Sequence, residues 1–338
     1  MKSFLTTLIL ILVCLTPSVA QQQKLHTPAE IFKIISDSKL MYEIGKLEKP
    51  VNCPDYSNKL NYQDSYRVYT DSGFYTSTYK INDKARPLLD KAEEYFSSNN
   101  SYSALMYYRM ALEADSTQYY ILTYIGQMYD GQRDYTNSIQ WYKKAISKNY
   151  IDYMAHWFLA DASFAIGDVD NAVDEIVIAR ILNRNNPRIA DSMNRIFKKA
   201  KRDTKDWCFN PQIAVTKTDS NSIKMAMDEK WAAYAMAKAL WHYEPGYKES
   251  MGVATGDYST KEEKACLFAQ LVAMENAKTD VKKDPQLKIL KKATENKLLD
   301  NYILYEIFLP AMPHLAYQLS EQAVQSIKDY VLNVRNTK

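Results

Sequence analysis

The chain has 338 residues, and its 43 Lys and Arg nearly balance its 40 Asp and Glu, which leaves a formal net charge of +3. Acidic and basic residues are interleaved along the chain, so the charge pattern argues against nucleic acid as a partner. The 8 Gly are few beside 27 Tyr and 5 Trp, and this composition favours packed helices over sheets with tight turns.

The first 20 residues have the pattern of a secretory signal peptide. Lys2 supplies a positive start, residues 4–15 form a short apolar run, and Ser-Val-Ala at 18–20 is a small-x-small cleavage site. The run is shorter than the roughly 20 apolar residues that span a bilayer. We therefore expect cleavage after Ala20 and a secreted or periplasmic chain with no transmembrane segment.

The four cysteines provide no disulfide framework. Cys14 is expected to leave with the signal peptide, and lipid attachment there is less favoured because Val13 precedes it where such signals have a small residue. Cys53, Cys208 and Cys266 remain, so at most one internal disulfide can form, and any two of the three are candidates. Their wide spacing includes no Cys-x-x-Cys pair, which argues against structural zinc.

Residues 21–84 are expected to hold one helix and an irregular connection. Residues 27–30 have the pattern of a helix start, and apolar residues follow at helical spacing, so we predict a helix over 28–47. The stretch 50–84 shows no clear period and contains prolines. We expect it to pack irregularly against the region that follows.

A shift of 34 residues aligns the sequence with itself between 85 and 186. Small and aromatic residues recur at the same places in successive units. The aligned positions are Ala92, Gly126 and Ala160; Ala104, Ser138 and Ala172; Tyr108, Tyr142 and Ile176; and Ala111, Ala145 and Ala179. This period is typical of helical-hairpin repeats, whose units stack because one unit alone cannot bury its apolar face.

The repeated pattern resembles the tetratricopeptide repeat (TPR). The units run over 85–118, 119–152 and 153–186. The middle unit matches best and departs chiefly at Tyr150, where the family has Pro. The resemblance implies an all-α superhelix of helical hairpins with a concave face. Pro187 starts a further helix, over 187–202, which we expect to cap the array.

The resemblance also implies a binding site on the concave face, which in this family is lined by the first helix of each unit. Carried onto this sequence, the candidate partner-binding residues are Arg86, Phe96, Tyr120, Gln127, Asp130, Trp157, Asp161 and Phe164. An aromatic and amide-bearing groove suits an extended or helical protein segment with apolar anchors. In the alternative interpretation, residues 50–84 or the following domain cover this groove.

Residues 203–338 lose the 34-residue register, and we predict that they form a separate helical domain. A loop, with room for one short strand at 213–215, leads into it. The predicted helices cover 228–243, 260–278, 284–299, 300–309 and 314–334.

Motifs for catalysis and for cofactors or metals are missing. The sequence contains no P-loop, dinucleotide fingerprint, nucleophile elbow or His-Glu-x-x-His. Glu262 and Glu263 are adjacent on an expected helix and point about 100° apart, which favours a solvated first turn over a catalytic pair. The spacing of Trp231 and Trp241 on one expected helix prevents a flat aromatic stripe and favours core packing over a glycan platform.

The sequence therefore predicts an all-α, secreted, non-catalytic protein without a cofactor. We expect it to bind a protein or peptide segment, as an adaptor or scaffold in the cell envelope. The alternative is a carbohydrate-binding component of an envelope nutrient-uptake system, since repeats of this kind also occur in glycan-binding envelope proteins. An enzyme with its site in 203–338 has no supporting motif.

Overall fold

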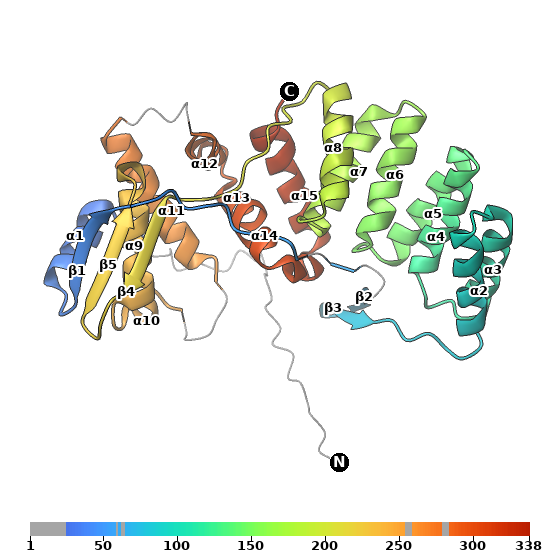
Figure 1. Ribbon diagram of the computed structural model, residues 1–338, viewed down its shortest axis with the longest axis horizontal. Helices are drawn as coiled ribbons and strands as arrows, with labels where there is room; N and C mark the ends of the chain where they lie inside the picture. The colour runs from blue at the N-terminus through green and yellow to red at the C-terminus, as the bar shows by residue number, and fades with distance from the viewer. Residues whose placement is uncertain (1–24, 59, 62–64, 254–258, 279–283) are drawn as a thin grey trace, which may run out of the picture. The chain divides into compact units, whose positions relative to one another are not determined.

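The computed structural model describes residues 25–58, 60–61, 65–253, 259–278 and 284–338 (Figure 1). The chain forms two compact units, each assembled from segments that are separate in the sequence. The sheet unit comprises the described part of Met1–Gly45 together with Val215–Glu275. The repeat unit comprises Lys46–Ala214 together with Asn276–Lys338. The predicted signal peptide, with Cys14 and Ala20, lies outside the described residues.

Consecutive helical hairpins of the TPR type make up the first part of the repeat unit (Figure 1). The helices are α2 (Arg86–Ser97), α3 (Ser101–Ala114), α4 (Tyr120–Gly131), α5 (Tyr135–Lys148), α6 (Tyr153–Ala165), α7 (Val169–Leu182) and α8 (Pro187–Lys199). The second helix of each hairpin begins in the same way, because Asn100, Asp134 and Asp168 stand 34 residues apart and each accepts a backbone N–H at its helix start. The predicted helical class with TPR-type hairpins is confirmed.

The aligned small and aromatic residues form the seams between these helices. Tyr108, Tyr142 and Ile176 are fully buried, as are the small residues aligned at the other positions. Ala92, Gly126 and Ala160 allow the helices to approach closely, which the 34-residue period predicted. The capping helix α8 begins at Pro187, after the N-cap Asn186, and ends at Lys199 instead of 202.

The repeat unit continues in a set of C-terminal helices. They are α12 (Pro285–Glu295), α13 (Leu299–Tyr302), η4 (Ile303–Phe308), α14 (Leu309–Ala311), η5 (Pro313–Gln318), α15 (Glu321–Tyr330) and η6 (Val331–Arg335). Of these, α15 and η5 pack on α7 of the last hairpin. The single helix predicted over 314–334 is interrupted, because the backbone is extended at Leu319, after η5, and at Ser320, which caps α15. The Lys328 ammonium lies 3.0 Å from the Asp174 carboxylate on α7.

The division of the chain differs from the predicted boundary at 203. Residues 276–338 belong with the repeats because α15 packs on α7. α7 buries Val173 and every residue from Ile176 to Leu182, and a helix that is buried around most of its circumference needs neighbours on more than one side. Arg202 adds a direct link, since its guanidinium donates to Leu332 O at 2.8 Å and Asn336 O at 3.1 Å.

The connection predicted to be irregular over 50–84 contains a β-hairpin. The strands β2 (Ser65–Thr70) and β3 (Gly73–Thr78) pair antiparallel, with Val68 opposite Tyr75. Thr and Tyr recur in both strands, and these residues favour a strand. Upstream of the hairpin, Cys53 is joined to Cys208 by a disulfide, which leaves Cys266 as a buried free thiol.

The sheet unit combines a three-stranded sheet with helices. Its elements are α1 (Pro28–Asp37), β1 (Met41–Lys46), β4 (Ile213–Lys217), β5 (Ser222–Met227), η2 (Glu229–Trp231), α9 (Ala232–Tyr243), α10 (Tyr247–Ser250) and α11 (Lys261–Asn276), and the strand order is β1-β5-β4. The helix predicted over 28–47 was too long, because Met41 starts a strand whose N–H donates to Asn221 O at 2.7 Å. Among the described helices, none combines the length and apolar character of a membrane span.

Candidate functional site

The eight candidate residues lie on the first helices of the three hairpins, but their environments differ. Arg86 and Phe96 on α2 are exposed, and Tyr120 on α4 is only 8% exposed. Gln127, Asp130, Trp157, Asp161 and Phe164 are partly buried. The predicted groove is therefore not one continuous open surface, and its two ends need separate descriptions.

At the α8 end, three candidate residues converge on an open pocket of about 340 Å³. The lining residues are Asp130, Tyr135, Asp161, Phe164, Ala165 and Arg195. They come from α4, α5, α6 and α8, so adjacent hairpins and the capping helix build the pocket together. Tyr135 and Arg195 were not among the predicted residues, because they lie outside the first helices that line the concave face in this family.

Asp130 is held by two hydroxyl donors. Its carboxylate accepts hydrogen bonds from Tyr142 at 3.0 Å and from Ser138 at 3.2 Å. Burial raises the pKa of Asp130, the two hydroxyls oppose this shift, and the charge of Asp161 adds to it. A second negative charge near a half-buried carboxylate favours any positive group that enters between them.

Asp161 is paired on one oxygen only. Its Oδ1 accepts from Arg195 Nη2 at 2.6 Å and from the Ser192 hydroxyl, whereas Oδ2 accepts no hydrogen bond from the described residues. The Arg195 guanidinium lies 5.6 Å from the centre of the Phe164 ring, and its side chain is 57% exposed. The pocket therefore has two carboxylates, one solvated guanidinium and an aromatic wall.

At the other end, the chain itself covers Tyr120. The ring of Tyr79, just after β3, lies 5.0 Å from the Tyr120 ring and 6.3 Å from that of Tyr119, both in edge-to-face orientation. Burial, the largest effect, raises the pKa of Tyr120 to about 12. The interpretation that residues 50–84 cover the groove thus holds at Tyr120, which is unavailable to a partner while this contact persists.

A series of polar side chains holds residues 60–82 along the edge of the array. We call this segment, described except for 62–64, the strap. Asp115, Asn149 and Asn183 stand 34 residues apart at the ends of α3, α5 and α7, and all three are buried. Their carboxylate or amide oxygens accept the backbone N–H of Asn82 at 3.0 Å, Arg67 at 3.1 Å and Leu60 at 3.5 Å, respectively. The strap therefore runs opposite to the order of the hairpins.

Trp157 is partly buried. Its ring stacks on Phe158 with centroids 5.0 Å apart. Its indole N–H is buried and donates to none of the described residues. A buried donor of this kind is uncommon, and the geometry does not make Trp157 part of the pocket at Asp161, whose lining excludes it.

The aromatic cluster weighed as a glycan platform is part of the core. Trp231 and Trp241 are fully buried, and Trp241 packs edge-to-face on Tyr247 with ring centres 5.5 Å apart. The prediction of core packing is confirmed. These indole faces contact protein, so they offer no stacking surface to a sugar.

Glu262 and Glu263 were wrongly predicted to form a solvated turn. Both pair with the Lys238 ammonium on α9, at 2.7 Å for Glu262, and Tyr234 donates to Glu263 at 2.7 Å. Burial alone would raise the pKa of Glu262, but the hydrogen bond from His242 and the charge of Lys238 lower it to about 2. The groups satisfy one another, which is typical of a structural network. Among the described residues, no three His, Cys, Asp or Glu are grouped as metal ligands.

Comparison with known proteins finds likeness only among solved structures. A scan against models of protein families finds no match, and a search of curated proteins finds none either. Part of the chain is similar to the first TPR of Spaghetti (RPAP3) bound to the HSP90 peptide SRMEEVD, at 19% identity and a TM-score of 0.34, covering 35% of this chain and 94% of that one. An NMR structure of the first TPR domain of human RPAP3 has the same identity and TM-score, with 35% and 93% covered. The TPR-type assignment rests on the hairpins of this chain and their period.

Proposed function

We propose that this chain is a non-catalytic binding protein whose three TPR-type units hold a protein segment through a basic side chain. The observation that carries the proposal is the open pocket at Asp130 and Asp161. Two carboxylates from adjacent hairpins face this pocket, and a single, largely solvated guanidinium opposes them. The free oxygen of Asp161 is an acceptor for a further donor.

The pocket walls match the rest of a Lys or Arg side chain. Phe164 and Tyr135 offer aromatic faces, against which an aliphatic stem or a guanidinium packs well. A charged hydrogen bond to Asp161 would fix the end of the side chain. An apolar anchor alone, as the sequence predicted, does not use the two carboxylates.

We also propose that the chain acts outside the cytoplasm, after cleavage at Ala20, as an adaptor or scaffold of the envelope. Support comes from the sequence pattern of residues 1–20 and from the Cys53–Cys208 disulfide, a bond that persists in oxidising compartments. The glycan-binding alternative has lost its candidate platform, since Trp231 and Trp241 are buried. We therefore retain a protein segment as the expected partner.

Selection from a displayed library of short random peptides tests the proposed pocket. Peptides that bind the wild-type chain should be enriched in Lys or Arg at one position. For a selected peptide, Asp161→Asn should weaken binding roughly 10-fold or more, because a charged hydrogen bond contributes about 1.5–3 kcal/mol. The matched control is Asp90→Asn, which removes the same charge from an exposed position on α2.

Three results would contradict the proposed pocket. Equal affinity of the wild type and Asp161→Asn, with melting temperatures also equal, would show that the pocket is not the binding site. Enrichment of acidic or purely apolar peptides would contradict the proposed basic anchor. If Asp90→Asn weakens binding as much as Asp161→Asn does, the effect comes from net charge and not from this pocket.

A further inference from the structure

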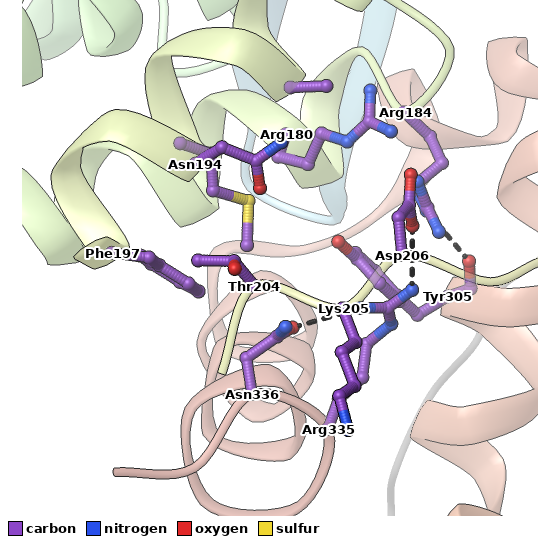
Figure 2. A pocket seen from close by; sticks show the side chains of 12 residues that line it. Arg180, Arg184, Asn194, Phe197, Thr204, Lys205, Asp206, Tyr305, Arg335 and Asn336 are labelled. Carbon is purple, nitrogen blue, oxygen red and sulfur yellow. Dashed lines mark hydrogen bonds and ion pairs between the residues drawn. The ribbon is translucent and has the colours of Figure 1, made fainter. Parts of the chain in front are cut away.

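A second, much smaller cavity of the repeat unit is lined by buried arginines (Figure 2). It lies where α7 and α8 meet the extended residues 204–206 and the C-terminal helices, and it offers about 20 Å³. In Figure 2, Arg180 and Arg184 line one side and Arg335 the other, with Asp206 and Tyr305 between them. All three arginines are at most 8% exposed.

Two of these guanidiniums are paired with carboxylates. Arg335 donates to Glu306 at 2.8 Å, to Asp206 at 3.1 Å and to Asn336 Oδ1 at 3.1 Å. Arg184 donates to Tyr305 O at 3.2 Å, and its Nη2 lies 3.5 Å from Glu306 Oε2. Glu306 is thus already shared between two cations, and it also accepts from the Tyr330 hydroxyl at 2.8 Å.

Arg180 lacks a comparable partner. Its only side-chain hydrogen bond to the described residues goes from Nη1 to Asn186 O at 3.0 Å, and it forms no ion pair with any of them. Burial and the neighbouring Arg184 lower the pKa of Arg180 to about 10, so it remains charged at neutral pH. Of the two nearby carboxylates, Glu306 already pairs with both Arg184 and Arg335, and Asp206 is 67% exposed. Three buried cations therefore face two anions.

An uncompensated buried charge is costly, and bound counter-ions relieve that cost. The size of the cavity limits what such an ion can be, because about 10–15 Å³ of this kind of space holds one water-sized particle. We propose that the cavity binds one small monovalent anion, of the size of chloride, with the free N–H groups of Arg180 as its principal donors. Sulfate and phosphate are too large for this space. This site is independent of the proposed peptide pocket.

Thermal unfolding of the full chain in chloride and in methanesulfonate, at constant ionic strength, tests the site. Replacing methanesulfonate by chloride should raise the wild-type melting temperature saturably, by about 3–6 °C at ten times the dissociation constant. Arg180→Met should abolish this rise. Arg188→Met, which removes the same charge from an exposed position at the start of α8, should preserve it.

A rise of equal size in Arg180→Met, or no saturable rise in the wild type, would overturn the proposal. Stabilisation by sulfate that also depends on Arg180 would overturn the size argument. Bromide soaked into wild-type crystals gives a readout that does not depend on the stability of a variant. An anomalous peak within hydrogen-bond distance of the Arg180 guanidinium is expected, and a well-diffracting soaked crystal without one would refute the site.

Discussion

Gly126 lies on α4 where the ring of Tyr142 crosses the helix. A methyl group at Gly126 would come within 2.6 Å of Tyr142 Cδ1, which is closer than carbon atoms pack. Tyr142 cannot move aside easily, because it is fully buried and its hydroxyl donates to Asp130. The small residue at this repeat position is therefore required by a specific contact, and that contact also positions a pocket carboxylate.

Gly126→Ala should destabilise the repeat unit by about 1–3 kcal/mol, as overpacking of a dense core does. Ala normally stabilises a helix by about 1 kcal/mol relative to Gly, so the sign of the effect is diagnostic. Gly131→Ala, at the exposed end of the same helix, is the control and should be neutral or stabilising. Urea unfolding of both variants measures the difference. A Gly126→Ala variant as stable as Gly131→Ala would disprove the close contact.

Asp152 is a buried carboxylate that caps α6. It accepts from the Thr123 hydroxyl at 2.6 Å and from the N–H groups of Met154 and Ala155 at 3.1 and 3.0 Å. Burial outweighs these bonds and raises the pKa of Asp152 to about 6. The pKa of Asp152 is higher in the folded chain than in the unfolded chain. This carboxyl therefore stabilises the fold most below about pH 4, and its contribution to the free energy of unfolding is lost as the pH rises through 6.

Asp152→Asn should therefore gain stability relative to the wild type as the pH rises from 4 to 7. The variant keeps an acceptor oxygen for the helix start but does not titrate, and the relative gain should be on the order of 3 kcal/mol. Urea unfolding at several pH values in this range gives the measurement. A difference between the two proteins that does not change with pH would show that Asp152 has an ordinary pKa.

Among the elements, the strap is the least usual. The residues that hold it end α3, α5 and α7 with nearly the same backbone geometry, with φ of −146°, −146° and −140° at Asp115, Asn149 and Asn183. Asn183 also donates to Leu60 O at 3.2 Å, so it pairs with both backbone groups of one strap residue. In these contacts, the side chains of Asp115, Asn149 and Asn183 bind backbone groups of the strap and not its side chains.

Asn149→Ala and Asn183→Ala should each release one part of the strap. Exchange of the Arg67 amide should accelerate in Asn149→Ala, and that of the Leu60 amide in Asn183→Ala, since each loses its acceptor. Loss of the buried partner should cost about 1–3 kcal/mol. Each variant serves as the control for the other in hydrogen-exchange mass spectrometry. Uniform acceleration along the strap in both variants would mean that the contacts do not act locally.

The contrast between the hairpins and the strap shows what the sequence could predict. The hairpins were predictable because their buried residues repeat every 34 positions. The residues that hold the strap repeat with the same period, but their partners at Leu60, Arg67 and Asn82 are backbone groups, which leave no pattern. The β-hairpin at 65–78 is short and pairs locally, whereas the strand at Met41–Lys46 pairs with β5, which is distant in the sequence.

The candidate site was partly predictable for a related reason. Asp130, Asp161 and Phe164 follow from the family register, and the structure brings them together. Arg195 and Tyr135 join them through the packing of α8 and α5, which no register describes. Tyr120 also matches the family register, but Tyr79 covers it. The register carries no information about what packs against a given position.

On the scale of the whole molecule, each unit is built from two separate stretches of the sequence, and residues 276–338 complete the repeat unit. α15 packs on α7, and Val324 and Ile327 of α15 are fully buried. A fragment that ends at the predicted boundary would expose this face of α7. Exposed apolar faces of that kind lead to aggregation.

Residues 46–214 expressed alone should aggregate or unfold without cooperativity, whereas co-expression with 276–338 should restore a cooperative transition in thermal melts. Residues 276–338 that carry Ile327→Asp, a charge at a fully buried position of α15, should fail to restore it. Cooperative unfolding of 46–214 alone would show that the repeats do not need the C-terminal helices.

The order of the cysteines along the chain also bears on when each thiol would meet an oxidant during the export that we propose. Cys53 and Cys208 precede Cys266 in the chain, and Cys266 is hidden only when the sheet unit has folded. The native pair can therefore form before its competitor emerges, provided that oxidation keeps pace with translocation. Oxidative refolding of the reduced chain that lacks residues 1–20 removes this head start, and Cys53, Cys208 and Cys266 then compete for the same bond.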